Sequence, residues 1–226
     1  MKSCPVCTTE AGRRLLHSFP SGRVLVCEGC GLGIFDGPMP DSVAADIAAS
    51  PTLGWIKRLV LRYEFGSFRH KKPMRILEIG AGSGELAFML HQFGHKVTCC
   101  DAGKENTERI SREYGLPVIT GAIEDRVLPL NAFDAVIMRH VFEHFDDPAL
   151  MTDYILGALV PGGRLVITQP NLDSWARRLA GPSWNWTLPY HRFFWTESTF
   201  VKFFEHRHCK VLRRRSLFSH LGMPLS

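Results

Sequence analysis

Short apolar runs alternate with amphipathic stretches through the middle of the chain. The runs have the length and apolar character of buried strands, and the stretches between them carry apolar positions at helical spacing. The expected strands are Arg75–Ile79, Lys96–Cys100, Val118–Gly121, Phe133–Met138 and Arg164–Gln169, and the expected helices are Glu85–Phe93, Glu105–Tyr114 and Pro148–Leu159. Strands that alternate with helices predict an α/β fold, with a mostly parallel sheet and helices on both of its faces.

The N-terminal residues predict a small β module instead. Leu15–Phe19 and Arg23–Val26 have strand character, and Pro20, Ser21 and Gly22 between them form the turn of a hairpin. The following segment, 36–52, contains three prolines and is typical of a linker.

An amphipathic helix is expected over Leu53–Phe68. Its apolar positions should be Trp55, Leu59, Val60 and Tyr63. We expect these side chains to pack on a core, and a helix that covers a ligand site is the alternative.

The C-terminal pattern differs from the middle of the chain. Thr196–His206 predicts a helix and Cys209–Ser216 a strand, after which only ten residues remain. A further complete strand hardly fits there, so we expect the sheet to be shortened, completed by a partner or rearranged.

Composition limits the class of protein. The chain has 226 residues, of which 45% are hydrophobic and 22% charged, enough for one full-sized core and a small extra module. No run approaches the roughly 18 to 20 apolar residues of a membrane span, and the first residues lack the apolar core of a secretory signal. We therefore expect a cytoplasmic protein.

Basic residues concentrate between Arg69 and Arg75 and between Lys202 and Arg215. The formal net charge is +5, and such runs are usually solvated surface. An anionic partner, such as nucleic acid, a nucleotide-sugar or a membrane surface, is the less favoured interpretation.

Four cysteines stand in two C-x2-C pairs, namely Cys4, Cys7, Cys27 and Cys30. Each pair turns its sulfurs toward a common point, so the four thiolates predict one tetrahedral Zn²⁺ site. Four thiolates leave no open coordination position, which makes the ion structural rather than catalytic. A redox dithiol and disulfides are the alternatives. The chain is then organised as a zinc ribbon at 1–36, a linker and helix at 37–72, and an α/β domain at 73–226.

A glycine loop follows the strand at Arg75–Ile79. Gly80, Gly82 and Gly84 allow a sharp bend and a close approach of the backbone to a ligand. Glu85 stands where a dinucleotide-binding loop would have its last glycine, and the carboxylate of Glu78 would repel a phosphate but suit a cationic amino-acid group. Asp101 follows Gly80 by 21 residues, the distance at which an acidic side chain reaches ribose hydroxyls, although it could also cap the next helix.

These motifs together resemble class I S-adenosylmethionine-dependent methyltransferases. The similar segments occur in the order of that family and are Glu78–Gly84, Asp101, Gly121–Asp125, Phe133–His144 and Pro161–Leu165. The resemblance covers about Arg75 to Gln169 and implies a Rossmann-like fold. It also implies that Glu78, Gly80, Ala81, Gly82 and Gly84 hold the methionine part, Asp101 the ribose, Ile123 and Glu124 the adenine, and that His140 makes a backbone contact to the cofactor. Family members often have an acid at the position of Ala122, so adenine recognition falls here to Glu124 or to the backbone near Ile123.

Methyl transfer is an in-line displacement, so such a protein mainly aligns a nucleophile and excludes water. A hydroxyl acceptor needs a general base, for which His140, His144 and His191 are the candidates, and His144 and His191 are preferred. His140, Glu143 and His144 could share a helical face as metal ligands do, but the resemblance speaks against a metal because the shared motif commonly occurs without one. Residues 170–195 form a candidate acceptor lid, with Trp184, Trp186 and Tyr190 as its walls or as core.

The favoured hypothesis is an S-adenosylmethionine-dependent methyltransferase that acts on a small molecule, at an oxygen atom of a sugar, a phenol or quinone-like compound, or a natural-product intermediate. A second hypothesis takes RNA or protein as the substrate and uses the ribbon for docking. A third is a zinc-ribbon interaction protein whose α/β domain does not catalyse. The oligomeric state is not predicted by the sequence.

Overall fold

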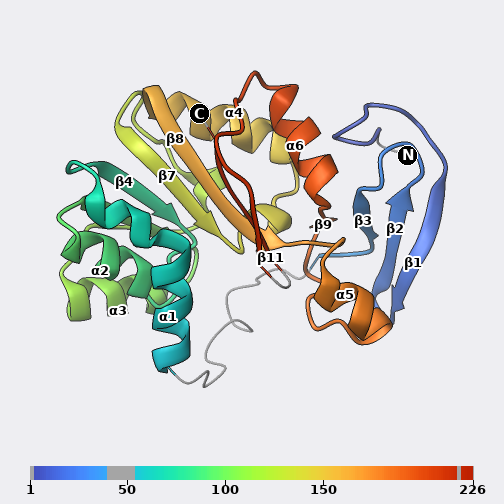
Figure 1. The fold of residues 1–226 in the computed structure, drawn as a ribbon, viewed down its shortest axis with the longest axis horizontal. Helices are drawn as coiled ribbons and strands as arrows, with labels where there is room; N and C mark the ends of the chain where they lie inside the picture. Colours follow the sequence, from blue (N-terminus) through green and yellow to red (C-terminus); the bar gives the residue numbers. More distant parts are fainter. Residues whose placement is uncertain (1–2, 40–53, 218–219, 226) are drawn as a thin grey trace. The chain divides into compact units, whose positions relative to one another are not determined.

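The computed structural model describes residues 3–39, 54–217 and 220–225, and Figure 1 shows its backbone. The chain separates into two compact units, each assembled from segments that are distant in sequence. We name them the ribbon unit (Met1–Asp41, His140–Asp153 and Ile167–Ser226) and the sheet unit (Ser42–Arg139 and Tyr154–Val166). α4 (Pro148–Ala158) and β8 (Leu159–Pro170) contribute residues to both.

The sheet unit is built on strands in the order β8-β7-β4-β5-β6. These are β4 (Arg75–Ile79), β5 (Lys96–Asp101), β6 (Val118–Thr120) and β7 (Phe133–Arg139) beside β8. β4 pairs in parallel with β5 and β7, so that Leu77 lies opposite Thr98 and Val136, and β5 pairs in parallel with β6. The expected parallel α/β sheet is confirmed.

Successive strand residues point to opposite faces of this sheet. Both sets are apolar, so helices cover both faces. Ile76, Ala135 and Ile137 pack on one face against α1 (Gly54–Phe65), α2 (Glu85–Gln92) and α3 (Lys104–Tyr114). The alternate positions Leu77, Val136 and Met138 are equally buried, and α4 buries Ile155 and Ala158. The carboxyl ends of the parallel strands therefore lie side by side at one edge of the sheet, whose two faces are both buried.

α1 turns a different face to the core than the sequence predicted. Trp55, Leu59 and Tyr63 were expected to be buried, but they are 64%, 62% and 58% exposed. Leu61 and Phe65 are buried instead, at 2% and 1%. The helix ends at Phe65, where a 3-10 turn (η1, Gly66–His70) begins, rather than at Phe68. The expected linker at 36–52 lies mostly outside the described residues.

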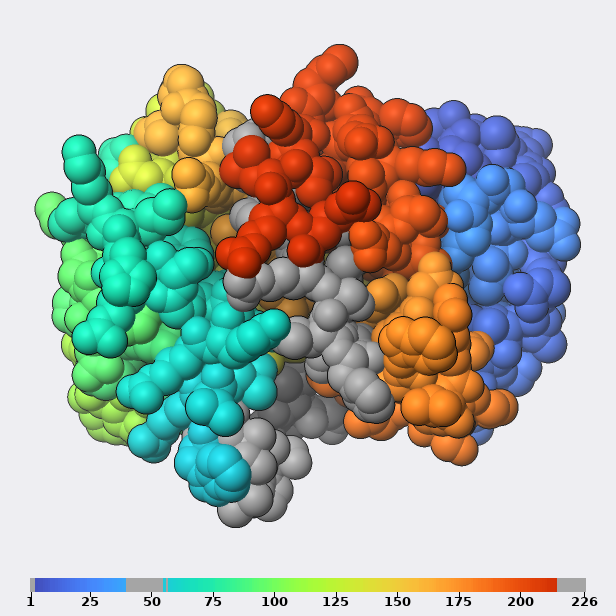
Figure 2. Space-filling view, viewed as in Figure 1, coloured from blue at the N-terminus to red at the C-terminus, as the bar shows by residue number. Residues whose placement is uncertain are grey.

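The ribbon unit contains a second sheet, of order β1-β2-β3-β9. β1 (Arg13–Phe19) and β2 (Gly22–Cys27) form the predicted hairpin, and β3 (Gly33–Asp36) continues it. The fourth strand, β9 (Phe193–Phe194), comes from the far end of the chain and pairs with Gly33 and Ile34. In Figure 2 the N-terminal strands (blue) lie directly against the segment around α5 (orange).

Aromatic side chains form the rest of the core of the ribbon unit. Phe142 lies in a 3-10 turn, η3 (Phe142–His144), and its ring is 5.4 Å from Trp195 and 5.4 Å from Phe204. α6 (Glu197–Glu205) begins at a capping box in which Thr196 and Thr199 bond each other's backbone N–H. A short helix, α5 (Trp175–Ala180), and a 3-10 turn, η4 (Gly181–Ser183), precede it. α6 therefore begins at a hydrogen-bonded cap and packs against a cluster of aromatic rings.

The C-terminal segment corrects the sequence prediction. A strand was expected over Cys209–Ser216, but β10 occupies only Arg215–Leu217. β11 (His220–Leu225) then pairs with it in antiparallel fashion, and the strand order continues from the end of β8 to β11 and β10. A hairpin thus fits into the few remaining residues, because both of its strands are short.

The longest helix of the described residues, α1, has 12 residues. A bilayer requires about 20 in helical form, and none of the described helices is long and apolar enough to cross one.

Candidate functional site

The glycine loop of the sheet unit joins β4 to α2. Gly82 and Gly84 have φ values of +53° and +77°, which side chains with a Cβ rarely adopt. A Cβ on Gly84 would also lie 2.7 Å from Cγ1 of Ile110. The loop is held by Asp101, whose carboxylate accepts hydrogen bonds from the N–H of Gly82 (2.7 Å) and of Gly103 (2.8 Å). Asp101 thus fixes the loop from the end of β5, as well as being the predicted ribose ligand.

Glu78 lies under this loop with 3% of its surface exposed. Its Oε2 atom has no hydrogen-bond partner among the described residues. Burial raises the pKa of this carboxyl to about 8, and the nearby positive charge of Arg139 offsets only part of that rise. A cationic group delivered to this position would supply the missing partner, which is what the amino group of a methionine moiety offers.

α1 is tied to the same edge of the sheet by charged side chains. Nζ of Lys57 lies 2.6 Å from Glu85 and 2.7 Å from Oγ of Ser83, both at the end of the glycine loop. Farther along, Glu64 accepts a hydrogen bond of 3.0 Å from Nε of Arg139, the last residue of β7. The sequence analysis named neither Lys57 nor Glu64, because charged residues on an amphipathic helix are usually solvated.

The segment after β6 lies next to Asp101, since the N–H of Gly121 donates to the backbone oxygen of Asp101 (2.9 Å). It forms a 3-10 turn, η2 (Ile123–Asp125), in which Ile123 is 4% exposed and Glu124 is exposed. An apolar and a polar side chain are therefore available to a purine, and the adenine role of these residues stays a prediction.

The four cysteines of the ribbon converge as their spacing predicted. Sγ of Cys4 lies 3.5 Å from that of Cys30, and Sγ of Cys7 lies 3.6 Å from that of Cys27. All four sulfur atoms are within 4.8 Å of one another. A tetrahedral zinc ion with Zn–S bonds of about 2.3 Å separates its sulfur ligands by about 3.8 Å, so the cluster has the dimensions that zinc requires.

A buried group of side chains follows β7 in the ribbon unit. Glu143, His144 and His191 bring one carboxylate oxygen and two ring nitrogens to within 4.8 Å of one another. Glu143 is 1% exposed and His191 2% exposed. Burial alone would raise the pKa of Glu143, but the surrounding imidazoles outweigh it and lower that pKa to about 2. Burial lowers the pKa of His191 to about 4, against the opposing effect of Glu143. The group thus combines a carboxylate with a neutral imidazole at neutral pH.

His140 begins this segment with a strained backbone. Its φ is +57°, unusual for a residue with a side chain. Its ring stacks on Trp186 at 4.7 Å, and its N–H donates to the backbone oxygen of Thr168 (2.8 Å). In this conformation the imidazole lies beside Glu143, whose Oε1 is 3.7 Å from Nδ1 of His140. The backbone contact to the cofactor remains a prediction.

The aromatic residues of the predicted lid have two different environments. Trp184 is 3% exposed and packs with Val24 and Phe35 of the N-terminal strands, so it is core. Trp186 and Tyr190 are half-buried and lie around the histidines, where the backbone oxygen of Tyr190 is 2.9 Å from Nδ1 of His144. Gln169, which the sequence analysis did not single out, lies near the end of β8 and is fully buried without a hydrogen-bond partner for either amide atom among the described residues.

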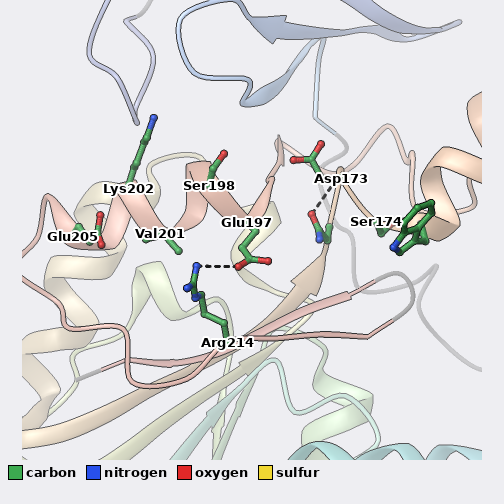
Figure 3. Close-up of a pocket in the computed structure, with 10 residues that line it drawn as sticks. Asp173, Ser174, Glu197, Ser198, Val201, Lys202, Glu205 and Arg214 are labelled. Atoms are coloured by element: carbon green, nitrogen blue, oxygen red, sulfur yellow. Dashed lines mark hydrogen bonds and ion pairs between the residues drawn. The ribbon is translucent and has the colours of Figure 1, made fainter.

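A pocket of about 690 Å³ opens between the start of the lid segment and α6. Figure 3 shows Asp173 and Ser174 on one side and Glu197, Ser198 and Lys202 on the other. An ion pair of 3.1 Å between Glu197 and Arg214 spans it. Its lining combines polar and charged side chains with Trp175 and Val201, and it contains none of the predicted catalytic residues.

The family model for a methyltransferase domain matches residues 54–217. This protein belongs to that family. The match includes both the glycine loop and the Glu143 segment, and the chain is thereby one of the S-adenosylmethionine-dependent methyltransferases, as the motifs had indicated.

Curated members of the family are similar over the central motifs. A ubiquinone biosynthesis O-methyltransferase from Xylella fastidiosa is 35% identical over 104 residues, which are 43% of this chain and 42% of the relative. A glycine/sarcosine/dimethylglycine N-methyltransferase from Actinopolyspora halophila is 31% identical over 112 residues, or 46% of this chain and 20% of the relative. The matched part of the methyltransferase thus spans less than half of either relative.

A solved S-adenosylmethionine-dependent methyltransferase from Mesorhizobium loti shares the fold. It superposes with a TM-score of 0.60 at 15% identity, covering 74% of this chain and 95% of that one. The Rossmann-like architecture is therefore common to both proteins.

Proposed function

We propose that this methyltransferase transfers the methyl group of S-adenosylmethionine to a hydroxyl group of a small molecule. The observation that carries the proposal is the buried group formed by Glu143, His144 and His191, directly after the strand that ends at Arg139. A neutral imidazole can accept the proton of a hydroxyl group. An O-methyltransferase among the relatives supports the choice of oxygen.

S-Adenosylmethionine would bind at the carboxyl ends of the parallel strands of the sheet unit, beside the glycine loop. Gly80, Ala81, Gly82 and Gly84 form the wall for the methionine part, and Glu78 receives its amino group. Asp101 keeps lone pairs for the ribose hydroxyls in addition to the hydrogen bonds that hold the loop. Ile123 and Glu124 would contact the adenine, and His140 would add a backbone contact.

The protein contributes alignment and proton transfer rather than covalent chemistry. His191 or His144 takes the proton of the acceptor hydroxyl, and the oxygen attacks the methyl carbon. The carbon–sulfur bond breaks with its electron pair on sulfur. Segment 170–195 would form the acceptor side, with Trp186 and Tyr190 beside the histidines.

Zinc would be bound by Cys4, Cys7, Cys27 and Cys30 in a structural role. The ribbon strands have a small core of their own, so the ion would supply much of the folding free energy of this segment, on the order of 10 kcal/mol.

Titration calorimetry of zinc-loaded protein with S-adenosylmethionine and S-adenosylhomocysteine tests the cofactor assignment. Asp101→Ala should weaken binding of both by at least tenfold, whereas Glu108→Ala, which removes an exposed charge on α3, should not change it. Asp101→Asn, which keeps the shape of the side chain, separates the ribose contact from the support of the loop. Failure of the intact protein to bind either compound would remove the proposal and leave a zinc-dependent interaction protein.

The acceptor is then identified with labelled methyl groups offered to phenols, sugars, amines and bulk RNA. Two of the C-terminal basic residues on which the RNA or protein alternative relies are engaged within the protein. Arg207 lies over Phe203 at 4.0 Å and 3.6 Å from Asp153, and Arg214 pairs with Glu197. Label in phenols or sugars supports the proposal, and label in RNA would support the alternative.

A further inference from the structure

A second pocket lies within the ribbon unit and has a volume of about 310 Å³. Leu16 of β1, Val26 of β2 and Leu172, just after β8, form the apolar part of its lining. Leu16 and Leu172 pack in the same core cluster as Trp184. Cys30 of the cysteine cluster lines the pocket as well. The apolar part of the lining is therefore fixed by the core of the ribbon unit.

Three arginines line the same pocket, which we name the arginine pocket (Arg14, Arg177 and Arg178). Arg14 lies on β1, in register with Val26 of β2. Arg177 and Arg178 lie in the last turn of α5, and the residue before them, Ala176, packs against the same core cluster. Guanidinium groups from two separate elements thus reach one pocket with an apolar lining.

The positive charge of these arginines is not offset by acidic side chains of the described residues. Within 3–39, 54–217 and 220–225, neither Arg14 nor Arg177 forms an ion pair, and Arg178 lies over the ring of Trp175 at 5.5 Å. Asp173 also lines the pocket, but it has no ion-pair partner in these ranges either. A single exposed arginine needs no partner, whereas three in one pocket repel one another. The pocket therefore has more positive than negative charge, which an anion from outside the protein would offset.

We propose that the arginine pocket binds the phosphate group of a small molecule. A guanidinium group presents its N–H donors in a planar fork that matches the oxygens of a phosphate. A carboxylate has a single negative charge and pairs with one such fork, whereas a phosphate monoester has a charge of about −1.5 to −2 at pH 7 and three oxygens for several donors. S-Adenosylmethionine contains no phosphate, so this ligand differs from the methyl donor. The site does not depend on the proposed hydroxyl methylation.

The pocket of about 690 Å³ indicates the rest of the ligand. It adjoins the arginine pocket, because Asp173 and Ser198 line both. Figure 3 shows Asp173 at one end of it and Glu205 on α6 at the other. Neither carboxylate forms an ion pair in the part of the chain that the structure describes, and each can accept hydrogen bonds from hydroxyl groups but would repel a further phosphate. The ligand that suits both pockets is a phosphorylated polyol, such as a sugar phosphate.

Titration calorimetry of zinc-loaded protein with inositol monophosphate, inositol and inorganic phosphate tests the site. We expect inositol monophosphate to bind most tightly, inorganic phosphate more weakly and inositol not measurably, since the phosphate supplies the charge and the polyol adds hydrogen bonds. Arg14→Gln and Arg177→Gln should each weaken binding of inositol monophosphate about tenfold or more, because each removes a charged hydrogen bond. Added salt should weaken binding to the unchanged protein, because it screens the attraction between guanidinium and phosphate.

Arg23→Gln is the matched control, because Arg23 is an exposed arginine on β2 of the same sheet and does not line the pocket. This variant should bind inositol monophosphate as the unchanged protein does, and circular dichroism verifies the folding of each variant. The proposal is overturned if the intact protein binds neither phosphate compound. It is also overturned if Arg14→Gln and Arg177→Gln bind inositol monophosphate as tightly as the intact protein.

A competing role for the arginines is to offset the negative charge of four thiolates around a zinc ion, since Cys30 lines the same pocket. Release of zinc to a chelator measures that role, and Arg177→Gln should release zinc at the same rate as the intact protein. Faster release without any change in phosphate binding would assign the arginines to the cysteine cluster and overturn the proposal. Labelled S-adenosylmethionine separates two supporting outcomes, because label in the bound inositol monophosphate makes it an acceptor and binding without label makes it a separate ligand.

Discussion

Glu78 shows how one buried carboxyl can link ligand binding to pH. Its pKa of about 8 lies above the ordinary value of 4.5, so the folded protein holds a proton there at neutral pH that the unfolded chain has lost. The free energy of unfolding therefore gains a contribution that is complete below about pH 4.5 and disappears as the pH rises through 8. A ligand cation beside Glu78 would favour the ionised form and expel the proton.

Calorimetry in two buffers with different enthalpies of ionisation measures this proton. At pH 7 we expect close to one proton to be released for each S-adenosylmethionine bound, and none in Glu78→Gln. The variant should also bind roughly tenfold more weakly, since a charged hydrogen bond is lost. Equal apparent enthalpies of binding in both buffers would contradict this.

Two features of Gly84 exclude a larger residue, namely its positive φ and its close contact with Ile110. Gly84→Ala places a Cβ at a positive φ and 2.7 Å from Ile110, which should lower the free energy of unfolding by about 2 kcal/mol or more. Gly66→Ala puts a Cβ where no atom lies within 4 Å and should change it by less than about 0.5 kcal/mol. Urea denaturation compares the two variants. A decrease in the free energy of unfolding as small for Gly84→Ala as for Gly66→Ala would show that the loop tolerates a side chain.

Several residues of the site could be predicted because their spacing is informative. The cysteine pairs and the glycine loop are local motifs, so Cys4 and Gly82 were identified before any contact was known. Glu143 was considered only for its spacing with His140 and His144, and Gln169 was not considered at all, since only burial without hydrogen-bond partners marks it as special. That property depends on the packing of distant segments and leaves no local pattern.

At the scale of elements, α1 illustrates the limit of periodicity. The sequence analysis chose one apolar face of this helix, with Trp55, Leu59, Val60 and Tyr63, over a second face with Leu61 and Phe65. The core takes the second, because Lys57 and Glu64 bind Ser83 and Arg139 and so fix the rotation of the helix. Strands β4 and β7 were predictable, since strands buried on both faces are mostly apolar.

Two leucines on α1 allow a matched test of this rotation. Leu61→Ala removes a buried side chain and should lower the free energy of unfolding by about 2 to 4 kcal/mol. Leu59→Ala, at 62% exposure, should cost less than about 0.5 kcal/mol. Denaturation curves of both variants measure the two effects. A larger loss of stability in Leu59→Ala than in Leu61→Ala would show that the face with Leu59 packs on the core, as the sequence analysis expected.

At the scale of the whole molecule, the two units divide the predicted tasks. The groups assigned to the cofactor lie in the sheet unit, apart from the backbone of His140, and the cysteines, Glu143, His144 and His191 lie in the ribbon unit. Removing zinc should therefore affect one unit more than the other. In hydrogen exchange, the amides of β3 and β9 should lose protection in zinc-free protein or in Cys27→Ser.

Binding of S-adenosylhomocysteine should change less than about twofold under the same conditions, because all of its predicted ligands except the backbone of His140 lie in the sheet unit. Cys209→Ser, a substitution outside the zinc cluster, serves as the control for loss of a thiol. Unchanged protection of Phe193 and Phe194 after zinc removal would show that the ribbon sheet persists without the ion.

The pairing of Ile34 with Phe193 also has a consequence for synthesis of the protein. The ribosome makes the zinc ligands first, but the last strand of their sheet appears only about 160 residues later. Until then the nascent module exposes the edge of β3, and open strand edges invite pairing with other chains. Early zinc capture would limit that risk, so the yield of native protein in cells should depend on zinc supply during translation.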